Sequence, residues 1–310
     1  MRALVALGGN ALTSPQGQAR PQDQIAAIGL ALGIVADLIA DGTDVVLTHG
    51  NGPQVGNLLV KNELAAAVVP PVPLDWCGAQ TQGTIGFVVL NALEHALAER
   101  GLHRPVATLV SRTLVDGADP GFTTPTKPIG RYLPADEVRS LLAHGQVWAD
   151  RGERGWRRVV ASPEPLQILD GDAALALVTA GFVVVTGGGG GIPCVRDDDG
   201  RLRGVEAVVD KDLAAALLAR TVAADVLVIA TDVENVVVGW GRPGAEPLEQ
   251  VGVDRLRALA AQGHFATGSM GPKVEAACRF VEAGGRYAVI CSLARIQDGA
   301  HGRAGTVVRA

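Results

Sequence analysis

Short apolar runs rich in β-branched residues alternate along this chain with longer segments that place apolar residues at helical spacing. Arg2–Leu7 and Asp44–Thr48 predict two strands, and Pro21–Asp41 between them predicts a helix that Gly42 ends. The pattern predicts further strands at Pro105–Ser111, Phe182–Thr186, Asp225–Ala230 (with a short extension at Glu234–Gly239), Tyr287–Cys291 and Thr306–Arg309. It predicts further helices at Cys77–Arg100, Val253–Gln262 and Val274–Ala283. This alternation predicts an α/β fold, in which a mainly parallel sheet has helices on both faces.

The alternation is interrupted between about residues 112 and 165, where Pro, Gly and charged residues dominate. One short helix (Pro134–Ala143) and a hairpin near Asp150–Gly155 are expected there. We interpret this stretch as a subdomain that protrudes from the sheet, either a mobile lid or a purely structural flap. We interpret the whole chain, residues 1–310, as one domain that includes this subdomain, with lobes of about residues 1–181 and 182–310.

Composition excludes several classes of protein. The chain has 310 residues, of which 48% are hydrophobic, and a net charge of −5 without a basic run, which argues against nucleic acid as a partner. Its four cysteines show neither metal-ligand spacing nor a disulfide framework, as expected of a cytoplasmic protein. The one charge-free stretch long enough to cross a bilayer, residues 173–195, contains a glycine run and Pro193, so we expect a soluble protein that does not enter membranes.

Lysine is rare in this chain, because arginine supplies most of the positive charge. Of 27 basic residues only Lys61, Lys127, Lys211 and Lys273 are lysines. Lys61 follows an apolar helical run and fits a solvated helix face. The other three lie in turn-rich or helix-start segments, where a compact ammonium has a use that a planar guanidinium cannot fill.

A run of five glycines, Gly187–Gly191, directly follows a predicted buried strand and includes Gly188 and Gly189. Backbone without side chains allows N–H groups to approach a polyanion closely. Asp210, Lys211 and Asp212 then open an alanine-rich helix, whose N-terminus favours bound anions. A flexible linker before a capped helix is the plainer interpretation, but the flanking strands favour a phosphate site.

Two further glycine turns are expected at the carboxyl edge of the sheet, where ligands bind in folds of this class. They are Gly8-Gly9-Asn10 and, after His49, Gly50-Asn51-Gly52. The spacing of the second turn does not fit a GxGxxG dinucleotide motif, and the five-glycine run lacks the Gly-Lys-Ser/Thr of a Walker A loop. His49 fits a hydrogen-bonded loop histidine. Lysines, glycine turns and nearby carboxylates together indicate phosphoryl transfer, which needs charge neutralisation more than a general base.

The ordered set of motifs resembles carbamate kinases, within the amino acid kinase superfamily, over essentially the whole chain. The matching segments are GGNAL (8–12), HGNGPQVGNLL (49–59), PTKPIG (125–130), ERGWR (153–157) followed by VVASPEP, GGGGIP (188–193), GVEAVVDKDLAA (204–215) and GHFATGSMGPKVEAA (263–277). In one position the chain departs from other superfamily members, which resemble one another in carrying a lysine two residues before the first Gly-Gly. Here that residue is Ala6. A lysine of the protruding subdomain supplies this charge in carbamate kinases, and Lys127 matches it.

The resemblance implies reversible phosphoryl transfer between ATP and carbamate, giving ADP and carbamoyl phosphate. It implies a three-layer α/β/α sandwich with an N-terminal carbamate lobe and a C-terminal nucleotide lobe, and a homodimer. Lys127, Lys211 and Lys273 would neutralise the transferred group, Asp212 would orient the lysines, and the turns at 8–10 and 50–52 would bind carbamate and phosphoryl oxygens. The residues expected to bind the nucleotide are Gly188, Gly189, Asp210, Thr231, Asp232, Phe265, Ser269 and Met270. Mg²⁺ would be held mainly by the nucleotide, without a protein metal site.

Two alternatives remain open at this stage. The chain could phosphorylate another small carboxylate, which Ala6 disfavours, or it could be a non-catalytic nucleotide-binding regulator, which the three motif lysines disfavour. The resemblance also suggests ATP production from carbamoyl phosphate in arginine catabolism.

Overall fold

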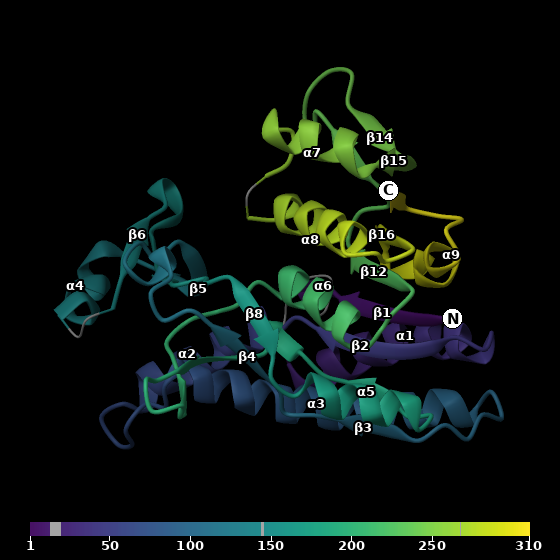
Figure 1. Cartoon of the computed structure of the whole chain (residues 1–310). Helices are drawn as coiled ribbons and strands as arrows, with labels where there is room; N and C mark the ends of the chain where they lie inside the picture. The colour runs from purple at the N-terminus through teal and green to yellow at the C-terminus, as the bar shows by residue number, and fades with distance from the viewer. Residues whose placement is uncertain (13–19, 144–145, 267) are drawn as a thin grey trace.

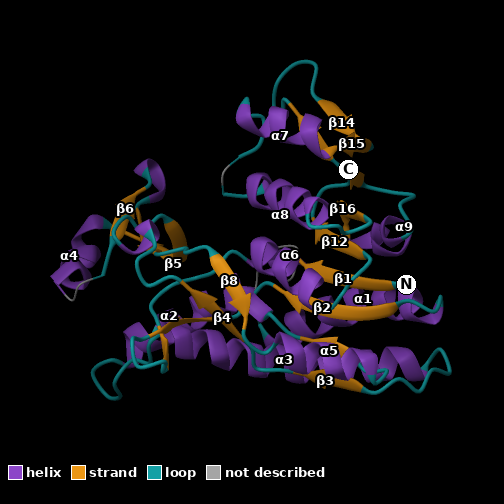
Figure 2. Cartoon of the chain, in the orientation of Figure 1, coloured by secondary structure: helices purple, strands orange, loops and turns teal. Residues whose placement is uncertain are grey.

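A computed structural model describes residues 1–12, 20–143, 146–266 and 268–310, and its centre is an eight-stranded sheet (Figures 1 and 2). The strands of this sheet are β1 (Arg2–Leu7), β2 (Asp44–His49), β3 (Val106–Thr108), β9 (Val183–Val185), β12 (Val226–Thr231), β15 (Gln250–Gly252), β16 (Tyr287–Ser292) and β17 (Thr306–Arg309). Their order is β15-β17-β16-β12-β1-β2-β9-β3. Every neighbouring pair is parallel except β16 and β17, which are antiparallel. The predicted mainly parallel sheet is confirmed.

Alternate residues of the central strands enter two separate hydrophobic cores. Val5 and Leu7 of β1 contribute to a core beneath α1 and α3, whereas Leu4 and Ala6 contribute to one beneath α6 and α8. The strands are apolar throughout because both faces are buried, as is typical of parallel sheets. The helices are α1 (Pro21–Ala40), α2 (Gly52–Ala65), α3 (Leu74–Ala98), α4 (Ala135–Ala143), α5 (Gly171–Thr179), α6 (Lys211–Thr221), α7 (Val253–Ala261), α8 (Met270–Glu282) and α9 (Ile296–Ala300). The expected three-layer α/β/α arrangement is therefore present.

Among the helices of the described residues, α1 alone is long and apolar enough to cross a membrane, judged by length and composition only. In the fold it packs against α3 and the sheet, and it buries seven side chains there, from Ile28 to Ile39. A helix that is buried in the core of a folded domain needs apolar residues, so its composition can match that of a membrane-spanning helix.

The protruding subdomain is smaller than its predicted range of 112–165. It consists of a three-stranded sheet and α4, and lies apart from the main body on the left of Figure 1. Its strands are β5 (Lys127–Leu133), β6 (Trp148–Asp150) and β7 (Trp156–Val160). The two ends of the predicted range, β4 (Arg112–Val115) and β8 (Pro165–Ile168), instead pair in a four-stranded sheet with β10 (Ile192–Arg196) and β11 (Leu202–Gly204).

The predicted lobe boundary at residue 181 also differs from the strand order. β9 lies between β2 and β3, and β10 pairs with β4, so residues 183–204 belong with the N-terminal half of the sheet. The chain moves to the other half only with α6 and β12. Sequence order alone could not reveal this, because 74 residues separate β9 from β3 and more separate it from β2.

Two local predictions also require correction. Helix α8 begins at Met270 rather than Val274, so Pro272 still lies in its first turn, where a proline is tolerated. The expected extension at Glu234–Gly239 forms β13 (Val236–Val238), which leaves the main sheet and pairs with β14 (Glu246–Leu248). Short 3₁₀ turns complete the fold at Gly9–Leu12, Pro120–Phe122, Gly152–Arg154, Gly188–Gly190 and Leu293–Arg295.

We expect Gly190→Ala to destabilise the fold more than Gly200→Ala. Both glycines have positive φ (91° and 83°), but a Cβ at Gly190 would lie 2.6 Å from the Val209 carbonyl oxygen, whereas none of the described atoms lies within 4 Å at Gly200. Strain alone costs about 1 kcal/mol and the backbone clash adds about 2 kcal/mol more. Denaturant unfolding of both variants measures this difference, and equal losses would contradict the close approach at Gly190.

Candidate active site

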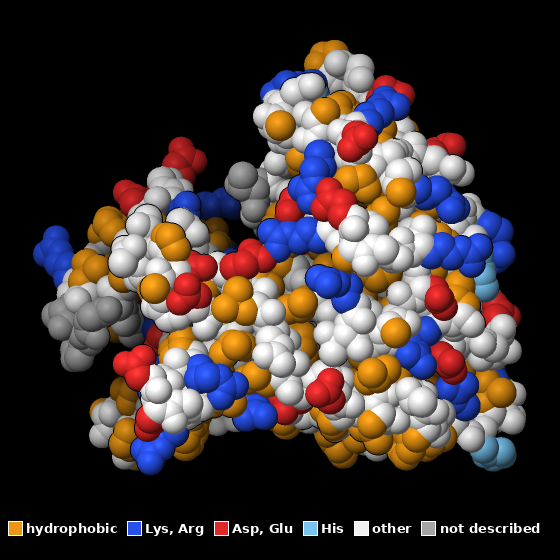
Figure 3. Space-filling view, in the orientation of Figure 1, with side chains coloured by type: hydrophobic (Ala, Val, Ile, Leu, Met, Phe, Trp, Pro, Cys, Tyr) orange, Lys and Arg blue, Asp and Glu red, His pale blue; other side chains and the backbone are white. Residues whose placement is uncertain are grey.

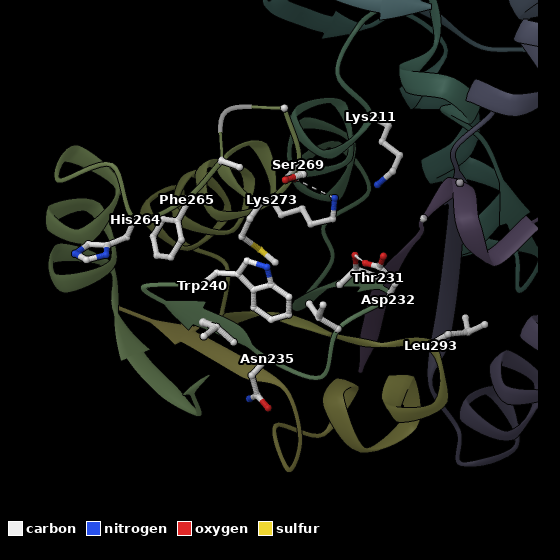
Figure 4. Close-up of a pocket in the computed structure, with 17 residues that line it drawn as sticks. Lys211, Thr231, Asp232, Asn235, Trp240, His264, Phe265, Ser269, Lys273 and Leu293 are labelled. Carbon is white, nitrogen blue, oxygen red and sulfur yellow. Dashed lines mark hydrogen bonds between the residues drawn. The ribbon is translucent and has the colours of Figure 1, made fainter. Parts of the chain in front are cut away.

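A cavity of about 530 Å³ opens at the carboxyl edge of the sheet, between the ends of β1 and β12 and the start of α8 (Figure 4). The predicted residues that line it are Gly8, Gly9, Lys211, Thr231, Asp232, Phe265, Ser269, Met270 and Lys273. Residues from distant parts of the sequence thus meet here because strand ends of a parallel sheet share one edge.

Sequence reasoning missed a second group of residues that line this cavity. They are Val233, Asn235, Val237, Trp240, His264 and Leu293, whereas Ala266 and Gly268 also line it within the loop expected to bind the nucleotide, from Phe265 to Met270. In Figure 4 the Trp240 indole lies between Phe265 and Thr231. Trp240 is 70% exposed, although tryptophan is one of the most apolar side chains. One signal could have drawn attention to it: only 4% of residues in this chain are aromatic, yet Trp240 stands between two glycines in a loop.

The centre of the site is a buried carboxylate that pairs with two lysines. Asp212, 3% exposed, forms ion pairs through Oδ1 with Lys211 Nζ and through Oδ2 with Lys273 Nζ, the latter at 3.3 Å. Lys273 Nζ also donates to the Ser269 carbonyl oxygen at 3.3 Å. In Figure 4 the two amino groups point toward one another at one end of the cavity. The carboxylate therefore gathers two positive charges where an anion can reach them.

The pKa of the Asp212 carboxyl lies below its ordinary value. Burial by itself raises that pKa, but the charges of Lys211 and Lys273 and their hydrogen bonds outweigh burial. Asp212 is consequently a carboxylate at neutral pH, which allows it to accept hydrogen bonds from both lysines rather than act as an acid.

Lys127 reaches the same region from the protruding subdomain. Its Nζ donates to Asp210 Oδ2 at 2.8 Å, and Asp210 is the N-cap of α6, two residues before Asp212. The third predicted lysine is therefore held by a different carboxylate at the N-terminus of α6, the helix that begins with Lys211. Asp210 does not line the 530 Å³ cavity.

The two glycine turns contact one another and Lys211. A Cβ at Gly50 would lie 2.9 Å from Gly9 N and 3.5 Å from Lys211 Cδ, so only glycine lets these segments approach so closely. Gly9 lies in the 3₁₀ turn after β1 together with Asn10, whose side chain is outside the described part of the structure. Thr267, within the predicted nucleotide loop, is also outside it.

The five-glycine run is shaped by close packing. Side-chain groups of Thr48, Gln82 and Thr113 donate to the carbonyl oxygens of Gly187, Gly188 and Gly190 at 2.9, 2.9 and 2.7 Å. A Cβ at Gly188 would lie 2.5 Å from the His49 ring, and one at Gly189 would lie 2.2 Å from Asn51 Nδ2. The glycines are thus required by neighbouring side chains, and the run is an ordered loop rather than the flexible linker of the alternative interpretation.

Neither Gly188 nor Gly189 lines the 530 Å³ cavity, where the nucleotide residues were predicted. Gly189 instead lines a second cavity of about 460 Å³, on the side of the subdomain. The predicted residues Asn51, Gly52 and Lys127 also line it, with Arg131 and Arg157 of the subdomain. Arg157 donates to the Gly130 carbonyl oxygen at 3.2 Å and lies over the Tyr132 ring. Figure 3 shows a hollow between the subdomain and the upper part of the molecule.

His49 is a buried, neutral imidazole next to these turns. Burial lowers its pKa, and a hydrogen bond between Nδ1 and the Gly50 carbonyl oxygen (2.9 Å) only partly opposes this. Since a carbonyl oxygen can only accept, Nδ1 carries the proton. The expectation of a hydrogen-bonded histidine is confirmed, and this bond fixes the start of the turn at residues 50–52.

Three comparisons place the chain among known proteins. The model of the amino acid kinase family matches residues 1–292. The carbamate kinase of Thermococcus kodakarensis is 44% identical over 313 residues, covering 99% of this chain and 98% of the relative, and the carbamate kinase-like protein YqeA of Escherichia coli is 43% identical with the same coverage. The structure of carbamate kinase from Giardia lamblia bound to AMP-PNP has a TM-score of 0.94 and 39% identity, over 99% of this chain and 98% of that one.

Asp212→Asn should lower the free energy of unfolding at pH 7 by about 3 kcal/mol, because it leaves two lysine charges beside a neutral amide in a buried site. Since the folded-state pKa of Asp212 lies below the unfolded value, its stabilisation is complete above pH 4 and is lost as the pH falls through the lower folded-state pKa. Denaturant unfolding of wild type and variant at pH 7 and at decreasing pH tests both points. A difference that grows on acidification would contradict the assignment.

Protonation of His49 should make the fold less stable in acid. The pKa of His49 in the folded state lies below its value near 6.5 in the unfolded state, so the unfolded state binds the proton more readily. The free energy of unfolding therefore falls as the pH decreases below about 6.5. His49→Asn keeps a donor for the Gly50 carbonyl and removes the titration. Its free energy of unfolding should change with pH less steeply between pH 6.5 and 5, by up to about 1.4 kcal/mol per unit. An unchanged slope would refute a buried neutral imidazole.

Proposed function

The chain belongs to the amino acid kinase family, and from its match to carbamate kinases over its full length we propose that it catalyses reversible phosphoryl transfer between ATP and carbamate. The products of the forward reaction are ADP and carbamoyl phosphate. The observation that carries the proposal is the pair of lysines on Asp212, which meets the glycine turns of β1 and β2 at the edge of the 530 Å³ cavity.

The reaction requires little acid–base chemistry of the protein. In the direction of ATP synthesis, the bond between phosphorus and the carbamate oxygen breaks while an oxygen of the ADP β-phosphate bonds to phosphorus. Carbamate leaves as an anion, so no proton has to be moved. The main barrier is negative charge gathered around the transferred group, which fixed positive charges and N–H donors lower.

Each part of the site has a role in this scheme. Lys211 and Lys273 neutralise the transferred phosphoryl group, and Asp212 holds both amino groups in place without serving as a base. The backbone N–H groups of Gly8 and Gly50 donate to the carbonyl oxygens of Ala230 and Leu7 at 3.1 and 3.0 Å, so these two glycines shape the turns. The backbone N–H groups of Gly9, Asn10, Asn51 and Gly52 supply the donors to the carbamate and phosphoryl oxygens. The close contact of Gly50 with Gly9 and Lys211 supports a common site for these groups.

The 530 Å³ cavity has the size and lining of a nucleotide site. Val237, Trp240, Phe265 and Met270 offer apolar surface for a base, and Lys211 and Lys273 lie where phosphates would follow. The Giardia lamblia relative binds the nucleotide analogue AMP-PNP. We therefore place ATP and ADP here, with Thr231, Asp232 and Ser269 beside them, and exclude Gly188, Gly189 and Asp210 from this pocket.

Mg²⁺ fits this site only with the nucleotide's help. Within residues 1–12, 20–143, 146–266 and 268–310, no group of three or more His, Cys, Asp or Glu side chains could hold a metal ion. The carboxylate nearest the lysines, Asp212, is already paired twice. When bound, Mg²⁺ would neutralise charge on the β- and γ-phosphates, held mainly by their oxygens and by water.

Lys127 compensates for the missing charge at Ala6. Ala6 is fully buried in the core beneath α6, so no charged group arises from β1 at this point. Lys127 enters from the subdomain instead, at the N-terminus of α6. This arrangement favours carbamate over another small carboxylate as the substrate, and the complete set of lysines argues against a silent regulator.

The cellular setting follows from the same proposal. We infer a cytoplasmic enzyme that forms ATP from carbamoyl phosphate, as arginine catabolism would require, and that acts as a homodimer without nucleic-acid or membrane partners.

Formation of ATP from ADP, carbamoyl phosphate and Mg²⁺ tests the proposal. We expect turnover in the wild type, a loss on the order of 100-fold in Lys127→Ala, and a similar loss in Lys211→Arg, because a planar guanidinium cannot replace a compact ammonium beside Asp212. Lys61→Ala is the matched control, since Lys61 lies exposed on α2, lines neither cavity and should keep full turnover.

Each outcome distinguishes among the candidate functions. Turnover with another small carboxylate but none with carbamate would favour the alternative kinase, and tight nucleotide binding without any turnover would favour the regulator. Full activity of Lys127→Ala would remove the explanation for Ala6 while leaving the reaction itself standing.

A further inference from the structure

We propose that Asp210 is a positioning residue that holds Lys127 beside the two lysines of Asp212. This role rests on the proposed function, because Lys127 acts there on the transferred phosphoryl group. Asp210 itself lines neither of the two cavities and would touch neither substrate.

The two oxygens of Asp210 have separate partners. Oδ1 accepts from the backbone N–H of Asp212 at 3.0 Å and of Leu213 at 3.5 Å, which makes Asp210 the N-cap of α6. Oδ2 accepts from Lys127 Nζ at 2.8 Å. One rigid carboxylate thus fixes the backbone of Asp212 and the amino group of Lys127 relative to each other.

The carboxylate of Asp210 is the side-chain partner that the described structure gives to Lys127. Lys127 is the first residue of β5, a strand of the protruding subdomain. It lies 83 positions before Asp210 in the sequence. A lysine side chain has four rotatable bonds, and holding it in one orientation costs conformational entropy. The bond to Asp210 removes that freedom before substrate arrives, which is the condition for a preorganised charge.

In the described part of the chain, the ion pairs of Lys127, Lys211 and Lys273 are made with two carboxylates, those of Asp210 and Asp212. The cluster therefore keeps a net positive charge, which an incoming phosphoryl group can neutralise. Positioning by Asp210 brings Lys127 to this place without cancelling the charge of the other two lysines.

Glu206 provides a matched comparison in the same structure. Its Oε1 accepts from the backbone N–H of Leu74, the first residue of α3, at 2.8 Å, and its Oε2 accepts from Arg158 of β7 at 2.9 Å. Like Asp210, it joins a helix N-terminus to a cation of the subdomain. Unlike Asp210, it holds no lysine of the site. A variant at Glu206 therefore separates docking of the subdomain from placement of Lys127.

The test compares Asp210→Asn with Glu206→Gln in ATP formation from ADP and carbamoyl phosphate. Asparagine caps helices as well as aspartate does, so α6 is preserved while the negative charge opposite Lys127 is lost. We expect turnover to fall by about 10-fold or more in Asp210→Asn, because a small displacement of the Lys127 amino group weakens its contact with the transferred group. The KM for ADP should stay within about twofold of the wild-type value. Glu206→Gln should keep turnover within about twofold, by the same reasoning.

A double variant tests whether Asp210 acts through Lys127. If it does, adding Asp210→Asn to Lys127→Ala costs no further turnover, because the lysine that Asp210 positions is already absent. Multiplicative losses, or unchanged or increased turnover in Asp210→Asn alone, would overturn the inference. Asp210→Ser, which retains a capping hydroxyl too short to reach Lys127, repeats the test should the asparagine variant fold poorly.

A readout independent of activity separates this inference from the proposed function. Acetic anhydride acetylates free amines, and mass spectrometry can follow each of the four lysines. Acetylation of Lys127 should become several-fold faster in Asp210→Asn and not in Glu206→Gln, and equal rates in all three proteins would refute the positioning bond. An inactive wild type would refute the proposed function and leave this measurement valid.

Discussion

The ion pairs of Asp212 with Lys211 and Lys273 are the interaction on which the site depends. A carboxylate that is 3% exposed would be unstable without partners, and two ammonium groups at one end of a cavity would repel each other without a shared anion. Each charge is thus kept in place by the others. The result is a positive site whose geometry is set before any substrate binds, which is what phosphoryl transfer requires of a protein.

The parallel sheet brings these charges together. β1 and β12 are neighbours, so the glycine turn after β1 and Thr231 after β12 open at the same edge. Helices α6 and α8 pack against each other on one face, and their N-terminal turns supply Lys211 and Lys273. The pairing of these apolar strands therefore decides which of the following loops line the same cavity.

The subdomain adds the charge of Lys127 to the site and supplies cations to the wall of the second cavity. The first cavity is lined by Trp240 and Phe265 and suits a nucleotide, whereas the second has the cations Lys127, Arg131 and Arg157 along its wall. Apolar packing of Ile129 and Val160 against Val55 and Leu59 joins the subdomain to α2. Lys127 is accordingly delivered by a packed element, even though the subdomain projects from the body of the molecule.

The sequence by itself determined the fold class, the boundaries of most central strands and the three lysines of the site, since apolar periodicity, glycine turns and the scarcity of lysine are local signals. Only the tertiary structure decided which elements pair. It placed β9 between β2 and β3, gave Gly188 and Gly189 packing neighbours away from the 530 Å³ cavity, and brought Trp240 to the wall of that cavity. The physical reason is that strand pairing and cavities depend on residues far apart in the chain. A local sequence pattern does not specify which distant residues a strand, a glycine or an exposed indole will contact.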